Sequence, residues 1–496
     1  MSESEGGLRR AVFRPVGIVT IGLGLCMAGC ALIGVLMEVG GYQRTPLDVG
    51  GWHGLVWSAA VTLALGGLML VVARNAQPDP RRRRHASLAV VLIWLVASVC
   101  GGLPYVFGCG SPLADAIFES ASGFTTTGAT VFGNIEGTIP SAILLWRALT
   151  HWLGGMGIVV LFVAIFPGIA SGAKEMFKNE VPGPTTDGLR PRIGETSVVL
   201  WQIYTALTLV QIVVMWLLGM DLFDAICHSF ATVATGGFST YDASIAHFES
   251  PAIEAAITVF MLLAGVNFSV YYAAARGDLR AVWRSTELRA YVGIVVGATA
   301  LITVALLSTR GWSDAFRVAA FQVVSFMTTT GFATDSYAVW PAPTITILLI
   351  LMVIGGSAGS TSGGLKVARA VMLVRGLWNQ IREGLRPGLV TTIRMDDKAV
   401  PGAVIRALGG HVTVFVTLLI VTTLAVTYSD PVSPYTAFAA TLSAVSNVGP
   451  SPFYVGADNF EAYSAGGKLI LTVAMVLGRL EFFAALALLS PDFWKR

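Results

Sequence analysis

Four short tracts rich in threonine and glycine recur along this chain, each at the end of an apolar stretch. With Gly128, Gly237, Gly331 and Gly449 taken as equivalent positions, the tracts lie 109, 94 and 118 residues apart. An alanine precedes the glycine by twelve residues in all four segments. Four tracts in one register indicate a unit of about one hundred residues that is repeated four times in a single polypeptide.

The residues before each glycine predict a short helix that leads into an extended tract. Asp115, Asp224 and Thr436 stand thirteen residues before the glycine, where an N-cap would begin a helix, whereas the third segment has Val318 at this position. A helix of about eight to ten residues is too short to span a bilayer. Each unit is therefore expected to contain a re-entrant pore loop.

Composition places most of the chain in lipid. Charged residues make up 12% of the sequence, hydrophobic residues make up 54%, and the mean hydropathy is +0.72, whereas soluble domains carry about 25% charged residues. The candidate spans cover residues 16–38, 54–74, 87–107, 140–167, 196–219, 252–274, 289–308, 342–374, 402–427 and 466–489.

The predicted fold is an all-α polytopic membrane protein with ten spans. The first two spans contain no Thr/Gly tract and form an N-terminal two-helix hairpin. The other eight form four helix–pore loop–helix repeats around a pseudo-fourfold pore. The expected divisions are residues 1–80 for the hairpin and 81–180, 181–285, 286–398 and 399–496 for the four repeats.

Basic residues gather in alternate loops. They lie at residues 9–14, 81–84, 174–178, 276–289, 369–398 and 495–496, whereas the intervening loops are acidic. By the positive-inside rule the basic loops face the cytoplasm, together with both termini. The first apolar run is longer than the core of a cleavable signal peptide, so we expect it to be retained as a span. The four Thr/Gly tracts then face outward.

The tracts have the residue types that a cation filter needs. Backbone carbonyls can replace the water around a cation, glycine permits the positive φ angles that turn successive carbonyls toward one axis, and threonine adds a hydroxyl at the inner mouth. The C-terminal ends of the pore helices would favour a cation below the filter. A simple turn at a helix end explains one such tract but not four in register. The predicted filter residues are Thr126, Thr127, Gly128, Thr235, Gly236, Gly237, Thr329, Thr330, Gly331, Asn447, Val448 and Gly449.

A Gly/Ser-rich stretch interrupts the apolar run at residues 342–374. A lipid-facing helix does not tolerate so many glycines, because freed backbone groups stay unsatisfied in hydrocarbon. We interpret it as a loop that obstructs the pore below the filter; close helix packing through Gly-xxx-Gly spacings is the alternative. The stretch also matches G-x-S-x-G, without the strand-to-helix context of a serine hydrolase. The predicted gating residues are Gly355, Gly356, Gly359, Gly363, Gly364, Lys366 and Arg479.

Arg479 lies within the last apolar span, where a charge is unfavourable unless it faces water or a partner. It is interpreted as a positive barrier in the ion path; an ordinary ion pair with Glu481 is the alternative. The stretch from Arg382 to Lys398 is basic and contains proline, so it is either a docking surface for a regulator or solvated positive-inside charge.

No residue pattern indicates catalysis. The five cysteines lack a CxxC spacing and are expected to be packing residues, the histidines lack metal-ligand spacing, and His151 is expected to be a hydrogen-bonded helix residue. The chain also carries no nucleotide-binding motif. An enzyme is therefore not expected.

The four tracts, at residues 124–130, 235–240, 328–334 and 446–450, closely resemble the filters of the Trk/Ktr/HKT superfamily of K⁺ transporters, and specifically its bacterial TrkH branch. The resemblance extends to residues 151–157, 265–268, 355–366 and 478–481 and to the two extra N-terminal spans. Some plant HKT proteins that favour Na⁺ carry serine for the first filter glycine; Gly128 here favours K⁺.

The resemblance implies K⁺ uptake across a bacterial inner membrane through a gated, selective pore. K⁺ would be the transported ion at the filter. The resemblance also implies a homodimer on a cytoplasmic ring of TrkA-like nucleotide-binding subunits, which would hold the regulatory nucleotide. A secondary transporter that couples K⁺ to Na⁺ or H⁺ is the alternative function. Four re-entrant loops favour the pore. A midplane carboxylate pair would favour the transporter, and none is evident in the sequence.

Overall fold

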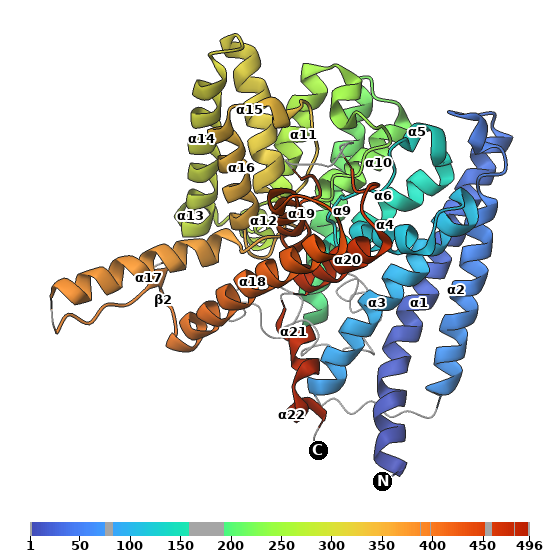
Figure 1. Cartoon of the computed structure of the whole chain (residues 1–496), viewed down its shortest axis with the longest axis horizontal. Helices are drawn as coiled ribbons and strands as arrows, with labels where there is room; N and C mark the ends of the chain where they lie inside the picture. Colours follow the sequence, from blue (N-terminus) through green and yellow to red (C-terminus); the bar gives the residue numbers. More distant parts are fainter. Residues whose placement is uncertain are drawn as a thin grey trace.

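The computed structural model describes residues 2–74, 83–157, 193–386, 388–396, 398–451, 459–480 and 482–494. The first two helices, α1 (Ser2–Val39) and α2 (His53–Val72), pack against each other as an antiparallel hairpin, joined by a loop with a short 3-10 turn, η1 (Pro46–Asp48). The two ends of the described chain lie at the same end of the molecule (Figure 1).

Four short helices that precede the Thr/Gly tracts form the centre of the fold. Each lies between an incoming and an outgoing helix. The elements of the first two units are α3 (Arg83–Cys109), α4 (Leu113–Phe124), α5 (Ile135–Thr138), α6 (Ser141–Gly155), α9 (Ile193–Leu217), α10 (Leu222–Val233), η3 (Ser244–Phe248), α11 (Pro251–Ala264), α12 (Phe268–Ala275) and α13 (Leu279–Arg284). Those of the last two are α14 (Thr286–Leu306), α15 (Trp312–Met327), η4 (Tyr337–Val339), α16 (Ala342–Ile354), α17 (Val367–Leu385), α18 (Gly402–Ser429), α19 (Pro434–Ser446), α20 (Ala465–Arg479), α21 (Phe483–Leu486), η5 (Ala487–Leu489) and α22 (Pro491–Trp494).

The outgoing helix of each unit packs against the short helix of the next. Helix α6 contacts α10, α11 contacts α15, α16 contacts α19, and α20 returns to contact α4. These contacts close a ring, with the four short helices inside it. The side chains of the short helices are largely buried, because they pack against neighbours on both sides.

The short helices begin earlier than the sequence predicts and are longer. The N-caps are Pro112, Asp221 and Ser433 rather than Asp115, Asp224 and Thr436, which lie inside the first turn, and the helices have 12, 12, 16 and 13 residues. Asp221 and Ser433 accept hydrogen bonds from backbone N–H groups of the first turn. A capping side chain therefore stands three residues before the predicted position in two of the units.

The outgoing helices end after only 13 to 15 residues. Each ends where glycine allows close approach: a Cβ on Gly154 would collide with the Phe124 carbonyl at the end of α4, and one on Gly478 with the Val445 carbonyl in α19. The predicted continuous span at 252–274 is therefore two helices, α11 and α12, with a 90° bend between them. Residues 158–167 of the predicted span at 140–167 lie outside the described residues.

Within the described ranges, six helices are long and apolar enough to cross a membrane, or seven if the bent pair α11–α12 is one span. They include α2, α14 and α18 and the apolar parts of α1, α3 and α9. The count of ten spans and the division of the chain into five parts stay predictions.

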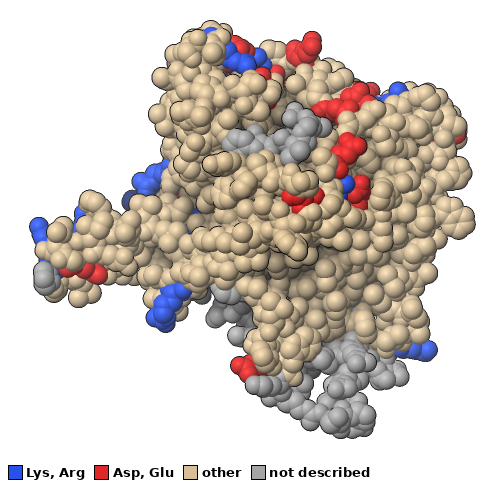
Figure 2. Space-filling model, in the orientation of Figure 1, with Lys and Arg blue, Asp and Glu red and all other residues tan. Residues whose placement is uncertain are grey.

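An arm projects from the body of the molecule. It consists of α17, the two-stranded hairpin β1 (Arg394–Met395) and β2 (Lys398–Ala399), and the beginning of α18 (Figure 1). Arg382 and Lys398, the ends of the predicted docking stretch, both belong to this arm; residues 387 and 397 lie outside the described residues. On the face shown in Figure 2, basic side chains lie on and near the arm, with further groups at the top and at the lower right, and most acidic side chains lie in the upper half.

Candidate ion filter and gate

The four Thr/Gly tracts share one unusual backbone conformation. Thr126, Thr235, Thr329 and Asn447 have φ angles of 53°, 54°, 57° and 53°, and the glycine two residues later has a φ of 80° to 100°. Left-handed backbone is uncommon for threonine, and a residue held in it is destabilised by about 1 kcal/mol or more. The same pattern at four positions supports the predicted register.

The tracts meet one another around a closed ring. A Cβ on Gly128 would collide with the carbonyl oxygen of Gly236, one on Gly237 with that of Thr330, one on Gly331 with that of Val448, and one on Gly449 with that of Thr127. Each glycine therefore lies against the carbonyl that precedes the equivalent glycine in the next unit. All twelve predicted filter residues belong to this central cluster, and the positive φ explains why the four glycines cannot carry a side chain.

Hydroxyl groups contact each other within the first and third tracts, and one amide joins the fourth tract to the first. The hydroxyls of Thr125 and Thr127 are 2.7 Å apart, and those of Thr328 and Thr330 are 2.8 Å apart. Asn447 donates to the Thr127 hydroxyl at 3.0 Å, which links the fourth unit to the first. These contacts fix the side chains next to the predicted ion path.

A buried ion pair contacts the segments that follow the first two tracts. Arg147 on α6 and Glu119 on α4 are 2.7 Å apart and almost fully buried. Glu119 accepts from the Val131 backbone N–H at 3.0 Å, and Arg147 donates to the Ser239 carbonyl at 2.8 Å. The pair thus joins the segment after the first tract to the segment after the second.

His151 lies behind the second tract. Its ring stacks on Phe238, its Nδ1 lies 2.7 Å from the Gly123 carbonyl, and its Nε2 accepts from the Phe238 N–H at 3.2 Å. The interpretation of His151 as a hydrogen-bonded helix residue is confirmed, and its contacts add a supporting role that the sequence does not indicate. The five cysteines are free thiols.

On the predicted outer side, the tracts border a cavity of about 680 Å³. Gly128, Gly237 and Gly331 line it together with the carboxylates of Asp242 and Asp335. Tyr241 also lines it and donates to Asp224 at 2.7 Å; burial and this hydrogen bond raise the pKa of Tyr241 to about 12, so the phenol stays a neutral donor at physiological pH.

The segment from Gly355 to Lys366, here named the Gly/Ser segment, is not helical and lies against the predicted inner side of the tracts. The Gly363 N–H donates to the hydroxyl of Thr329 at 2.7 Å, and a Cβ on Gly363 would collide with the Ser446 carbonyl. The Thr361 hydroxyl donates to the Val233 carbonyl at the end of α10, at 3.1 Å. Because these residues do not form a helix, packing of one helix on another through Gly-xxx-Gly spacings does not describe them.

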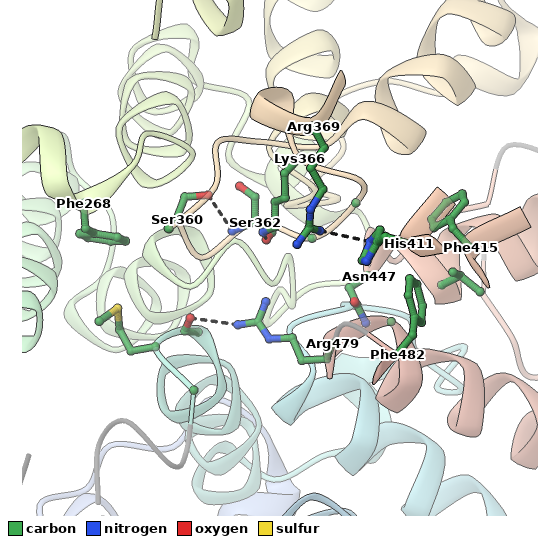
Figure 3. A pocket seen from close by; sticks show the side chains of 18 of the residues that line it. Phe268, Ser360, Ser362, Lys366, Arg369, His411, Phe415, Asn447, Arg479 and Phe482 are labelled. Atoms are coloured by element: carbon green, nitrogen blue, oxygen red, sulfur yellow. Dashed lines mark hydrogen bonds between the residues drawn. The ribbon is translucent and has the colours of Figure 1, made fainter. Parts of the chain in front are cut away.

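Arg479 joins this segment to the first unit. Its guanidinium donates to the carbonyls of Thr361, Gly154 and Gly155 at 2.8 to 2.9 Å. Figure 3 shows it between the Gly/Ser segment and the end of α6. Glu481, the predicted alternative partner, lies outside the described residues.

A cavity of about 80 Å³ adjoins these groups. Its described lining includes Lys366, Arg369 and Arg479 but no Asp or Glu (Figure 3). The positive charges make this cavity unfavourable for a cation in the arrangement observed.

All seven predicted gating residues thus lie in or against one region below the filter. Glu119 and Arg147 are not among the residues that the sequence predicts for the site. An arginine within an apolar span is a signal of function or of a buried partner, and Arg147 could have been found by that rule. Among the described residues, no group of three or more His, Cys, Asp or Glu is placed to hold a metal ion.

The fold and the apolar helices define a multi-pass membrane protein in which four Thr/Gly tracts meet in a closed ring. The family model "TrkH: Cation transport protein" matches residues 56–495, so the chain belongs to the TrkH family, which comprises transport proteins rather than enzymes.

Three relatives illustrate the similarity. The chain is 38% identical to the Trk system potassium uptake protein TrkH of Escherichia coli (strain K12), over 98% of this chain and 99% of that protein. It is 36% identical to the corresponding protein of Halomonas elongata, with the same coverage. The crystal structure of the potassium transporter TrkH from Vibrio parahaemolyticus superposes with a TM-score of 0.86 at 36% identity, covering 98% of this chain and 99% of that one.

Proposed function

We propose that this protein takes up K⁺ through a gated pore in the bacterial inner membrane. The ring of four tracts carries this proposal, because each glycine abuts a backbone carbonyl of the next unit. Such a ring supplies a dense set of carbonyl oxygens for a cation that has lost its water. The potassium uptake named for the relatives supports K⁺ as the transported ion.

The Gly/Ser segment and Arg479 form the proposed gate. The segment lies against Thr329 and Ser446 on the inner side of the filter, and Arg479 holds it to the end of α6. Passage requires that this arrangement opens, since the segment obstructs the path and the nearby charges repel a cation.

The proposed assembly is a homodimer, each protomer with its own pore, that is regulated by a cytoplasmic ring of nucleotide-binding subunits. Both termini and the arm would then face the cytoplasm. The arm supports the dimer: Val374, Leu377, Trp378, Ile381 and Leu385 form one apolar stripe along α17 that is exposed in the single chain. The words "Trk system" in the relatives' names fit a membrane subunit that works with further components.

Flux measurements on protein reconstituted in liposomes test the main proposal. Tracer K⁺ should exchange at zero K⁺ gradient, and an imposed voltage should drive it, with no requirement for a Na⁺ or proton gradient. Net K⁺ accumulation that follows an imposed Na⁺ or proton gradient at zero voltage would instead establish the alternative, a coupled secondary transporter.

Deletion of residues 359–363 tests the gate. The basal K⁺ flux without the cytoplasmic partner should rise, while the K⁺/Na⁺ flux ratio should persist because the filter residues are unchanged. If the deletion protein elutes and melts like the parent yet conducts no faster, the Gly/Ser segment is a packing element and not a gate.

A further inference from the structure

A buried carboxylate on α14 contacts the Gly/Ser segment and the helix that follows it. Glu287 is the second residue of α14 and is 8% exposed. One of its oxygens, Oε1, accepts from the N–H of Ala358 at 2.6 Å and from the N–H of Ala368 at 3.2 Å. A single atom therefore joins the fourth residue of the segment to the first turn of α17.

The same carboxylate reaches the bend between α11 and α12. Its Oε2 lies 3.4 Å from the Asn267 amide nitrogen, and Asn267 caps α12 by accepting from the Ser269 N–H. The bend in turn contacts the segment, because the Phe268 N–H donates to the Gly359 carbonyl at 3.0 Å. Glu287 thus connects the two broken stretches of backbone below the filter.

The residue before Glu287 contacts the arm. The Thr286 N–H donates to the Asp396 carboxylate at 2.7 Å, and the Asp396 N–H lies 3.4 Å from the Thr286 hydroxyl. Asp396 stands in the turn between β1 and β2. The turn between β1 and β2 is therefore hydrogen-bonded to the first turn of α14, which carries Glu287.

We propose that Glu287 is a positioning residue that latches the Gly/Ser segment in its obstructing arrangement, and that Asp396 connects this latch to the arm. The inference rests on the proposed function of the segment as a gate. One carboxyl oxygen of Glu287 accepts from both backbone N–H groups, so the segment stays in place until the first turn of α14 moves. A cytoplasmic partner bound to the arm would open the gate by this route.

Hydrogen exchange of the full-length protein tests the latch without reference to conduction. In Glu287→Ala the amides of Ala358 and Ala368 should exchange at least about tenfold faster than in the parent, since each loses its acceptor. Glu287→Gln keeps an oxygen in place and should give a smaller increase, while Glu287→Asp is one methylene shorter and should resemble alanine. Asp278→Ala is the matched control, because Asp278 caps the nearby α13 without touching the segment. Unchanged exchange at Ala358 and Ala368 in Glu287→Ala overturns the latch.

Flux then links the latch to the gate. Glu287→Ala should raise the basal K⁺ flux of the intact protein about tenfold with an unchanged K⁺/Na⁺ ratio. It should add nothing in the protein that lacks residues 359–363. An equal rise in both backgrounds places the action of Glu287 elsewhere and overturns the inference. Failure of the deletion alone to raise flux counts against the gate itself, whereas the exchange result still decides whether Glu287 latches the segment.

The arm connection has its own test. Asp396→Ala should speed exchange at Ala358 and Ala368 in the same direction as Glu287→Ala, to a smaller extent. No change at either amide refutes the connection between arm and latch.

Discussion

The first filter glycine, Gly128, combines a positive φ with contact against the neighbouring unit. A serine there meets left-handed strain of about 1–2 kcal/mol and a collision with the Gly236 carbonyl. Gly128→Ser should therefore lower the K⁺/Na⁺ flux ratio by about tenfold, because one carbonyl of the ring is displaced. Flux of each ion into liposomes measures the ratio.

Gly110→Ser is the control for this substitution. Gly110 also has a positive φ, of 67°, but its added Cβ would meet nothing within 4 Å. This variant should keep the parental flux ratio. Equal ratios in Gly128→Ser and the parent would remove Gly128 from the filter.

Substitutions of Arg479 can show whether its charge or its carbonyl contacts restrict the K⁺ flux. Replacement by alanine removes a positive charge below the filter and three hydrogen bonds to the Gly/Ser segment and α6. The K⁺ flux should rise by about tenfold to a hundredfold, which corresponds to about 1 to 3 kcal/mol. Arg479→Lys keeps the charge but loses the planar fork. It should conduct like the parent if charge is the cause, and like alanine if the carbonyl contacts hold the gate.

The elution volume of each Arg479 variant must also be compared with that of the parent protein, because loss of the three contacts can disturb folding. A properly assembled Arg479→Ala protein with the parental flux would place Arg479 outside the ion path.

The positions of the predicted filter and gating residues could be found from the sequence. Glycine at a fixed spacing indicates backbone conformation, and the twelve predicted filter residues and seven predicted gating residues lie in two adjoining regions. The partners of Arg479 could not be predicted: they are backbone carbonyls of Thr361, Gly154 and Gly155, which every residue has and no side chain reveals. Glu287 could not be predicted either, because it stands in the basic stretch at residues 276–289 and its partners are backbone N–H groups of Ala358 and Ala368.

At the scale of elements, the ends of helices were the least predictable feature. The spans at 252–274 and 466–489 read as continuous because apolar residues continue past the break. The outgoing helices end where Gly265 and Gly478 approach a neighbouring side chain or a carbonyl, and this approach depends on tertiary packing. The arm was likewise invisible, since an apolar stripe on α17 has the same pattern whether it is buried or exposed.

The Glu119–Arg147 pair connects two elements, α4 and α6, and gives a prediction at this scale. Removal of one partner leaves a buried charge without compensation and should destabilise the fold by about 3–5 kcal/mol. Glu119→Gln and Arg147→Met should each lower the thermal unfolding midpoint in detergent. The double variant should lower the unfolding midpoint by less than the sum of the two single variants, because neither charge remains buried alone. Additive losses would show that the two side chains act independently.

At the scale of the whole molecule, the arm makes the proposed dimer testable. Aspartate at Leu377 and Ile381 places charge in the middle of the exposed stripe on α17. The double variant should elute as a monomer, and its K⁺ flux per protomer should persist because each chain holds a complete ring. Gln380→Asp on the same helix is the control and should elute like the parent. A double variant that elutes like the parent would show that this stripe is not the dimer contact.

The closure of the ring from Gly449 back to Thr127 has a further consequence. In a pore made of four identical subunits, every substitution enters four times. Here it enters once, in one quadrant, while the other three quadrants keep their geometry. Permeation in such a chain can change in small steps, and the unequal tracts, from Thr-Thr-Gly to Asn-Val-Gly, are the kind of difference that single-quadrant variation leaves behind.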